Sequence, residues 1–274
     1  MLKQRILTAL VMISLLVWAL FAWPQWAFAL FLGTFILIGA WEWTALCGLQ
    51  KLPERLLYLA LVAMAGGFLI VTPSWTLPLM AIAVLWWLWI FIELVAYPDV
   101  RRGFLASRPG KLLSGFVLLL PTWIAPLVLR AQPQGEWLTL FLLLIVWAAD
   151  TGAYFAGHRW GNTKLAPRIS PGKTWEGVAG GLAAVLVLVL AAGAYRLPQP
   201  KLLVAWVALA LVTAFVSVLG DLFESRVKRA AGVKDSGVLF PGHGGVLDRI
   251  DAFTAAAPLF TLVWLCWQAP AGAP

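Results

Sequence analysis

Nine runs of mostly apolar residues, each close to the length of a bilayer-spanning helix, dominate this sequence. A spanning helix needs about 20 such residues. The runs occupy approximately residues 6–22, 26–46, 55–72, 76–97, 112–130, 137–157, 175–194, 202–223 and 252–268. Because backbone polar groups inside a bilayer must be hydrogen-bonded within the protein, such runs predict helices. We therefore predict an all-α, polytopic integral membrane protein with about nine transmembrane helices.

The composition excludes an ordinary soluble domain. Hydrophobic residues make up 62% of the 274 residues and charged residues only 12%. A soluble chain of this length would need a more polar surface. The only two cysteines, Cys47 and Cys266, form no C-x-x-C or Cys/His cluster, so we expect no structural zinc site.

The distribution of basic residues predicts the orientation in the membrane. If the N-terminus is cytoplasmic, only Arg130, Arg196 and Lys201 of the 20 Lys and Arg residues fall in external segments. Such a bias is the positive-inside rule. It explains the net charge of +8 through cytoplasmic loops and anionic membrane lipids, so we expect no nucleic-acid partner. We predict a bacterial inner-membrane protein with its N-terminus in the cytoplasm.

The acidic residues divide the chain into two halves. Of the twelve in the sequence, seven follow residue 140, namely Asp150, Glu176, Asp221, Glu224, Asp235, Asp248 and Asp251. The charged connections 98–111, 157–174 and 224–250 all fall on the cytoplasmic side. We therefore interpret residues 1–135 as scaffold helices and residues 136–274 as the half that carries a cytoplasmic site.

Two carboxylates lie within or at the end of apolar runs. An ionised Asp at bilayer depth costs about 2.5–3.5 kcal/mol even on permissive scales, so such residues are usually paired or functional. Asp150 shares a helical face with Tyr154 and His158, and we expect it to face the interior of the bundle. Asp221 ends the eighth run on a face with Ser217, Glu224 and Ser225. A structural ion pair is the alternative for both.

The segment from Ser225 to Asp251, SRVKRAAGVKDSGVLFPGHGGVLDRID, concentrates the remaining charge; we call it the signature segment. Asp248 and Asp251 open the ninth run, where a helix dipole alone could favour them. Two carboxylates brought together would instead suit Mg²⁺, which takes carboxylates plus substrate phosphates. Glycines at 242, 244 and 245 beside His243 would let backbone amides approach a phosphate. Lys228, Arg229 and Lys234 are the cationic candidates, although the positive-inside rule also predicts basic residues here.

The connection that ends in Ser170-Pro-Gly-Lys173-Thr174-Trp-Glu176-Gly177 contains a Gly-Lys-Thr. A P-loop would require glycine where Pro167 stands, preceded by a strand. We therefore predict a cytoplasmic loop that brings Ser170 and Lys173 near the site, followed by a helix from Thr174.

The signature segment resembles that of the phosphatidate cytidylyltransferases, or CDP-diacylglycerol synthases. The resemblance runs through Ser225-x-Val-Lys-Arg, Lys234-Asp235-x-Gly, Phe240-Pro-x-His243-Gly-Gly-Val and Asp248-Arg249-Ile-Asp251. Ser170 to Gly177 and Asp150-x-x-Ala-Tyr154 are similar to further family elements, although Gly172 stands where members often have lysine. Residues before 136 resemble the family only in length and hydrophobicity.

The resemblance implies that CTP and phosphatidate react to CDP-diacylglycerol and pyrophosphate, with Mg²⁺ held by Asp221 and Asp248, in a homodimer. We expect Asp150 near a second metal cation. We expect Asp235 to orient the side chain of Lys234 or Arg229. For the phosphates of both substrates we expect contacts from Lys228, Arg229, Ser170, Lys173, Lys234, His243, Gly244, Gly245 and Arg249. A CTP-using lipid kinase, which would transfer the γ-phosphoryl group, is an alternative. A transporter with Asp150 and Asp221 as ion ligands is less favoured, because we find no repeat.

Overall fold

The structure is a computed structural model that describes residues 2–96, 103–196, 200–240, 242 and 244–268, with the side chains of 2–7, 194–196 and 200–201 outside the description. Within these residues the chain forms α1 (Leu2–Ala22), α2 (Gln25–Leu46), α3 (Leu52–Val71), α4 (Thr76–Ala96), α5 (Arg108–Arg130), α6 (Gly135–Trp160), α7 (Trp175–Arg196), α8 (Pro200–Ala230) and α9 (Leu247–Gln268). Two 3₁₀ turns, η1 (Pro73–Trp75) and η2 (Phe104–Ala106), precede α4 and α5. All helices from α2 to α9 are long and apolar enough to cross a membrane. The predicted all-α, polytopic fold is confirmed, with eight rather than nine of the described helices meeting the length and composition of a span.

Two elements extend beyond the predicted boundaries. Helix α8 continues to Ala230, and α9 begins at Leu247, so both ends of the signature segment are helical. The connection predicted as a plain loop contains the antiparallel strands β1 (Lys164–Ala166) and β2 (Ser170–Thr174). Pro171 and Gly172 disfavour a strand in isolation. Lys164 nevertheless pairs with Thr174, and Ala166 with Ser170, across a turn at residues 167–169.

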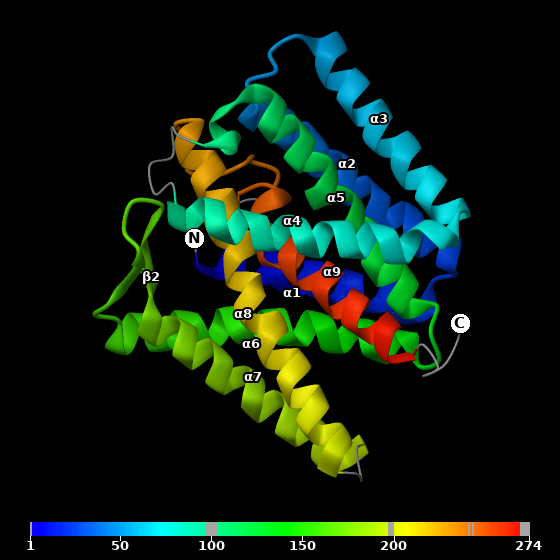
Figure 1. The fold of residues 1–274 in the computed structure, drawn as a ribbon, viewed down its shortest axis with the longest axis vertical. Helices are drawn as coiled ribbons and strands as arrows, with labels where there is room; N and C mark the ends of the chain where they lie inside the picture. Colours follow the sequence, from blue (N-terminus) through cyan, green and yellow to red (C-terminus); the bar gives the residue numbers. More distant parts are fainter. Residues whose placement is uncertain (1, 97–102, 197–199, 241, 243, 269–274) are drawn as a thin grey trace.

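The site-bearing helices pack as two antiparallel pairs. Helix α6 lies against α7, and α8 against α9, with α8 also contacting α7 (Figure 1). Small residues allow the first pair to approach closely: a Cβ at Gly180 would come within 2.2 Å of the Ala156 Cβ. Close approach through small residues is a common way for membrane helices to associate.

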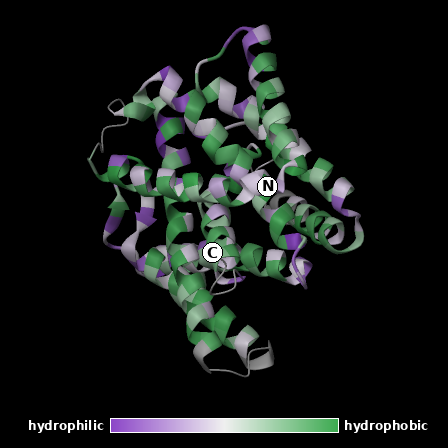
Figure 2. Ribbon diagram, turned by 45° about the vertical axis from the view of Figure 1, so that its right-hand side comes forward, coloured by the Kyte–Doolittle hydropathy of each residue, from purple (hydrophilic) through white to green (hydrophobic). Residues whose placement is uncertain are grey.

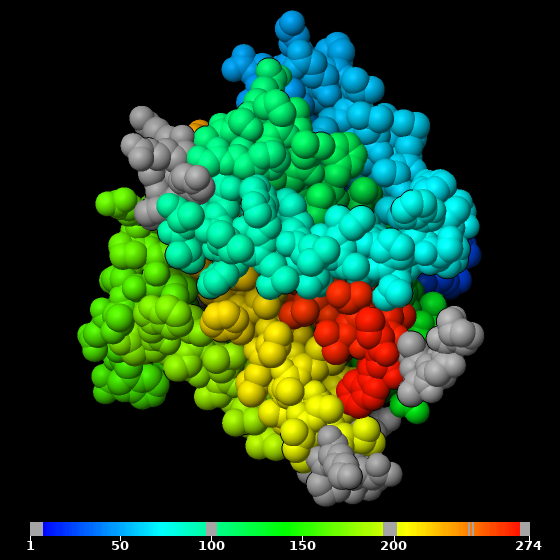
Figure 3. Space-filling view, in the orientation of Figure 1, coloured from blue at the N-terminus to red at the C-terminus, as the bar shows by residue number. Residues whose placement is uncertain are grey.

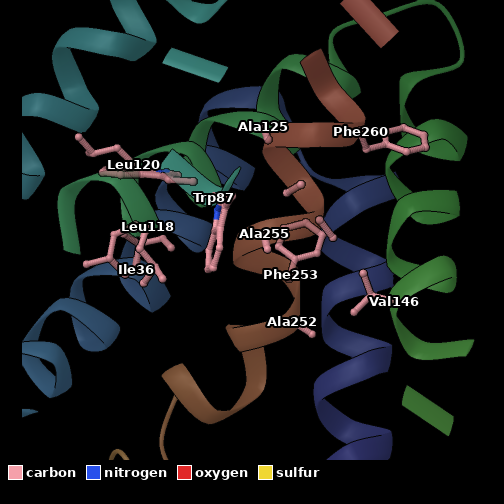
Figure 4. Close-up of a cluster of buried hydrophobic side chains, with 14 of the residues drawn as sticks. Ile36, Trp87, Leu118, Leu120, Ala125, Val146, Ala252, Phe253, Ala255 and Phe260 are labelled. Atoms are coloured by element: carbon pink, nitrogen blue, oxygen red, sulfur yellow. The ribbon is translucent and has the colours of Figure 1, made fainter. Parts of the chain in front are cut away.

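Helices α4 and α5 join the two halves of the chain. Both contact α9. Trp87 of α4 donates its indole N–H to the carbonyl of Thr254 in α9 at 3.1 Å. Figure 4 shows Trp87 beside Ala255 and the ring of Phe253. On α8, Phe223 is fully buried and contacts the rings of Trp43, Trp86 and Trp87.

The outer surface is apolar, as expected for lipid contact. Large hydrophobic side chains such as Leu85 and Ile92 of α4 are exposed. In Figure 2 hydrophobic residues predominate along the helices and hydrophilic ones gather toward helix ends and connections. Figure 3 shows α4 lying across one face. The C-terminal ends of α4, α6 and α8 and the β-hairpin all lie toward the left of Figure 1, so the helices that lead into the three most charged connections end on one side.

Candidate active site

A cavity of about 300 Å³ lies among α6, the β-hairpin, α7 and α8, and we call it the polar cavity for the charged side chains in its otherwise mostly apolar lining. Its polar lining comes from three segments distant in sequence, and comprises Asp150, Tyr154, Lys173, Thr174, Ser217 and Asp221. Asp150 lines this cavity at an exposed position, so it faces an open cavity between helices, whereas the prediction placed it in the interior of the bundle. Tyr154 and His158 share its helical face, with their rings stacked at 6.1 Å. The volume is at the small end of ligand pockets, enough for part of a nucleotide.

Lys173 and Asp221 form an ion pair in this cavity. The Lys173 Nζ lies 2.5 Å from the Asp221 Oδ2. The hydroxyl of Ser225 donates to the Asp221 Oδ1 at 3.2 Å, one helical turn further along α8. Both side chains of the ion pair keep partial exposure, 23% for Lys173 and 31% for Asp221. A partly exposed pair between two predicted site residues can exchange partners when a charged ligand enters.

The local sequence of the hairpin explains why Lys173 reaches α8. Trp175 donates its backbone N–H to the Thr163 carbonyl at 2.9 Å, and Glu176 accepts from the Thr163 N–H at 3.1 Å, which closes the hairpin base. Thr174 caps α7 by accepting the Gly177 N–H at 3.1 Å, a typical N-cap contact. Fixed on both sides, Lys173 projects into the cavity.

More charges surround the cavity. Asp150, Asp221 and Asp251 lie within electrostatic range of one another, and Lys173 and Arg249 lie within range of Asp150. Among the described residues, no three His, Cys, Asp or Glu side chains are arranged to hold a metal unaided. Mg²⁺ commonly takes only one or two carboxylates plus substrate phosphates. The Asp150 and Asp221 oxygens, both lining one cavity, fit that kind of shared site.

Asp248 lies at the centre of a second cluster. Its Oδ1 is 2.6 Å from the Lys228 Nζ. Its Oδ2 accepts from the Ser236 N–H and hydroxyl at 2.9 Å each and from the Gly245 N–H at 2.8 Å. Lys228 also lies 3.3 Å from the Glu224 Oε1. Lys228 is thus a buried counter-ion for two carboxylates, and Asp248 holds the signature segment together.

The glycines of this segment approach carboxylates of the protein itself. Gly244 has φ +80°, and a Cβ there would come within 2.4 Å of the Asp248 Oδ2. A Cβ at Gly245 would come equally close to both carboxylate oxygens of Glu42. The glycines were expected to let backbone amides approach a phosphate, and in the structure they approach the carboxylates of Asp248 and Glu42 instead. Contact of these glycines with CTP stays a prediction. His243 lies outside the described residues.

The other predicted site residues lie nearer the surface. Arg229 donates to the Val233 carbonyl at 3.2 Å at an exposed position. Lys234, Asp235 and Arg249 are exposed, and Ser170 is half-buried at the start of β2. Of these, Arg249 is within electrostatic range of Asp150. Roles for Arg229, Lys234 and Asp235 stay predictions.

Two glutamates from the first half of the chain were missed in the sequence. Glu42 of α2 accepts hydrogen bonds from the signature segment, and Glu93 of α4 lies 3.7 Å from the Arg226 guanidinium. Both are buried. Each lies inside an apolar run, so the rule that singled out Asp150 applies to them as well.

An apolar groove of about 370 Å³ adjoins the polar cavity. It shares Leu165, Val178 and Val218 with that cavity. The rest of its lining comes from α4, the hairpin, α7 and α8, and includes Phe91, Leu94, Val95, Ala166, Trp175, Phe215, Leu219 and Leu222. Among the described residues that line the groove, Arg168 alone is charged. A charged cavity that continues into an apolar groove can receive an amphipathic molecule.

Comparisons with known proteins identify the family. Residues 3–267 match the profile of the Cytidylyltransferase family. The chain is 45% identical over 274 residues to a phosphatidate cytidylyltransferase of Pseudomonas aeruginosa, covering all of both chains. It is 39% identical to the protein of that name in Haemophilus influenzae, covering 95% of this chain and 98% of the relative. A Bacillus subtilis protein of the same name is 48% identical over 43% of this chain and 44% of its own. The chain belongs to the cytidylyltransferase family.

Proposed function

We propose that this protein transfers the cytidylyl group of CTP to phosphatidate, which yields CDP-diacylglycerol and pyrophosphate. Family membership and full-length similarity to proteins named phosphatidate cytidylyltransferase support the proposal. The structural observation that carries it is the junction of the polar cavity with the apolar groove. One substrate is a charged nucleotide and the other a membrane lipid, so the reaction needs such a junction.

The chemistry places few demands on the protein. A phosphate oxygen of phosphatidate attacks the α-phosphorus of CTP, and the bond to the β-phosphate breaks as pyrophosphate leaves. Such transfers depend mainly on in-line positioning and charge neutralisation. Lys173 and Arg249 provide positive charge beside Asp150 and Asp221. The lipid phosphate is already ionised, so no strong general base is needed.

We also propose dependence on Mg²⁺, held by Asp150 and Asp221. When bound, it would neutralise negative charge on the CTP phosphates. Asp221 is balanced by Lys173 in the structure, and the lysine would then turn to a substrate phosphate. Asp248 stays a predicted ligand, because a carboxylate oxygen bound to Lys228 retains a second lone pair. A second cation beside Asp150 also stays a prediction.

Labelled CTP tests the reaction directly. Purified protein in detergent is incubated with phosphatidate, Mg²⁺ and CTP labelled at either the α- or the γ-phosphate. We expect label in the lipid from the α position alone, and none after EDTA treatment. Label from the γ position, tested also with a polyprenol acceptor, would indicate the lipid kinase instead and refute the proposal.

The acyl chains of phosphatidate are expected to enter the apolar groove, so Val95→Trp should weaken lipid binding. Val95 lines the groove and is 68% exposed, so a larger side chain obstructs the groove without disturbing the core. Losing contact with two methylenes, at about 0.8 kcal/mol each, raises the KM for phosphatidate about tenfold. The effect should be smaller for a short-chain phosphatidate, with the KM for CTP unchanged.

Ile92→Trp is the matched control for this variant. Ile92 lies three residues earlier on α4, is 62% exposed, and is absent from the groove lining. It should keep the parent KM values. Equal effects of the two variants, or an effect independent of chain length, would place the acyl chains elsewhere.

The remaining proposals concern location and assembly. We propose that the site faces the cytoplasm from a bacterial inner membrane, where CTP and phosphatidate meet. The common side of the charged connections supports this orientation (Figure 1). We further propose a homodimer, which the mass of the detergent-solubilised protein tests.

A further inference from the structure

We infer that Glu42, in the half of the chain interpreted as scaffold, is a positioning residue for the active site. It acts by accepting hydrogen bonds from the start of α9 and from Ser236 of the signature segment. Glu42 is 6% exposed and lies near the end of α2, more than 190 residues from the segment it contacts. The inference deepens the proposed function, on which its kinetic test rests.

The first observation is the cap on α9. The Glu42 Oε1 accepts the Val246 N–H, and the Oε2 accepts the Leu247 N–H, both at 2.9 Å. The first N–H groups of a helix have no partner within the helix, and a negative charge there is favoured by the helix dipole. A carboxylate from α2 therefore fills the place that an N-cap side chain or an anion would take.

The second observation is a shared hydroxyl. Ser236 Oγ lies 3.0 Å from the Glu42 Oε2 and 2.9 Å from the Asp248 Oδ2. A hydroxyl has one proton, so it donates to one carboxylate at a time. Glu42 and Asp248 thus contact the same serine hydroxyl, so a change at Glu42 can alter the contact that Asp248 makes with it.

The third observation is the space that the glycines leave. A Cβ at Gly237 or Gly245 would come within 2.4 Å of the Glu42 Oε1. Both glycines stand in the signature segment, and their lack of a side chain admits this carboxylate. Backbone of the signature segment therefore approaches the Glu42 carboxylate as closely as it approaches the Asp248 carboxylate.

These contacts connect Glu42 to the reacting groups without placing it among them. The first turn of α9 carries Asp248 and Arg249, and Asp251 follows directly after it. Arg249 is within electrostatic range of Asp150, and Asp251 of both Asp150 and Asp221. Fixing the start of α9 fixes the position of these charges relative to the polar cavity.

Glu42→Gln tests the inference. The amide offers one acceptor oxygen in place of two and sets an NH₂ group against a backbone N–H. We expect kcat/KM for CTP to fall about 10- to 100-fold, the usual effect of losing a group that orients functional residues, with a rise in the KM for CTP. Hydrogen exchange at the Val246 and Leu247 amides should accelerate at least about tenfold, roughly the effect of losing one hydrogen bond.

Thr44→Val is the matched control on the same helix. Thr44 is fully buried, accepts from the Arg55 Nε at 2.9 Å and donates to the Trp41 carbonyl at 2.6 Å. Its partners lie outside the signature segment. We expect the control to keep the parent KM for CTP and the parent exchange at Val246 and Leu247, even if it lowers the thermal midpoint.

A merely structural role would give a different result. Partial unfolding lowers the amount of active enzyme, and hence Vmax, but leaves the KM of the folded fraction unchanged. If Glu42→Gln shows only that loss, with exchange at Val246 and Leu247 equal to the control, the inference is overturned. If exchange accelerates but no variant or parent protein shows cytidylyl transfer, the positioning contact stands and the proposed function fails.

Ser236→Ala keeps the test decisive if Glu42→Gln does not fold. It removes only the shared hydroxyl and should shift the KM for CTP in the same direction by a smaller factor. Where both variants fold, the double variant should lose less than the product of the two single effects, because they act through one contact. Parent-like kinetics and exchange in Ser236→Ala, or fully independent effects, would overturn the inference.

Discussion

Asp221→Asn is expected to lower turnover by about two to three orders of magnitude, the range for removing one preorganised electrostatic group from an active site. The substitution preserves shape but removes the negative charge that pairs with Lys173 at 2.5 Å. It also removes one of the two carboxylates lining the polar cavity. Initial rates with α-labelled CTP measure the effect, alongside gel filtration to verify folding.

Two comparisons sharpen this experiment. Glu54→Gln removes an exposed carboxylate that pairs with Arg108 at 2.9 Å, and exposed pairs contribute little, so turnover should change less than about twofold. Lys173→Met should also reduce turnover, and combining it with Asp221→Asn should cost less than the product of the single effects. Near-normal turnover in Asp221→Asn would exclude Asp221 from the reaction.

The helices could be predicted from the sequence because the bilayer constrains them so strongly. A run of about 20 apolar residues in lipid has few alternatives to a helix. The prediction of 76–97 for α4, which spans Thr76–Ala96, is therefore close. Where the bilayer no longer constrains the chain the boundaries were less accurate: α8 continues seven residues past the predicted 223, to Ala230.

The residues that line the candidate site were easier to predict from the sequence than the ion pairs they form. Asp150, Lys173 and Asp221 were each predicted near a site, and the structure brings them to one cavity. That Lys173 pairs with Asp221, rather than with Asp150, depends on the direction of the hairpin. The hairpin depends in turn on hydrogen bonds at its base, such as that between Thr163 and Glu176, and the sequence analysis predicted a plain loop here.

Glu42 shows what a motif search overlooks. The signature segment draws attention because its charges and glycines are adjacent in sequence, whereas Glu42 stands alone in α2. Its own signal was physical: a single carboxylate in an apolar run requires partners. The sequence could identify Glu42 and Glu93 as residues that need an explanation. Only the tertiary structure shows that the partners are Val246 and Leu247 for one and Arg226 for the other.

Lys228→Met is expected to destabilise the protein by about 3–5 kcal/mol, the usual effect of removing one partner of a buried ion pair. Lys228 is 8% exposed and lies between Glu224 and Asp248. Its loss leaves two neighbouring buried carboxylates without their cation. Denaturant titration of the detergent-solubilised protein measures the free energy of unfolding, and Lys234→Met, at an exposed position, is the control.

Glu224→Gln in the Lys228→Met background separates repulsion from the loss of a contact. The two Glu224 oxygens are buried and accept no hydrogen bond within the described part of the chain, so neutralising this side chain removes charge and little else. The double variant should recover part of the lost stability if repulsion between Glu224 and Asp248 causes the loss. Activity should stay low, because Asp248 still lacks its 2.6 Å contact. If Lys228→Met unfolds at the same denaturant concentration as the parent protein, the ion pairs add no net stability. Asp248 must then be held by Ser236 and Gly245 alone.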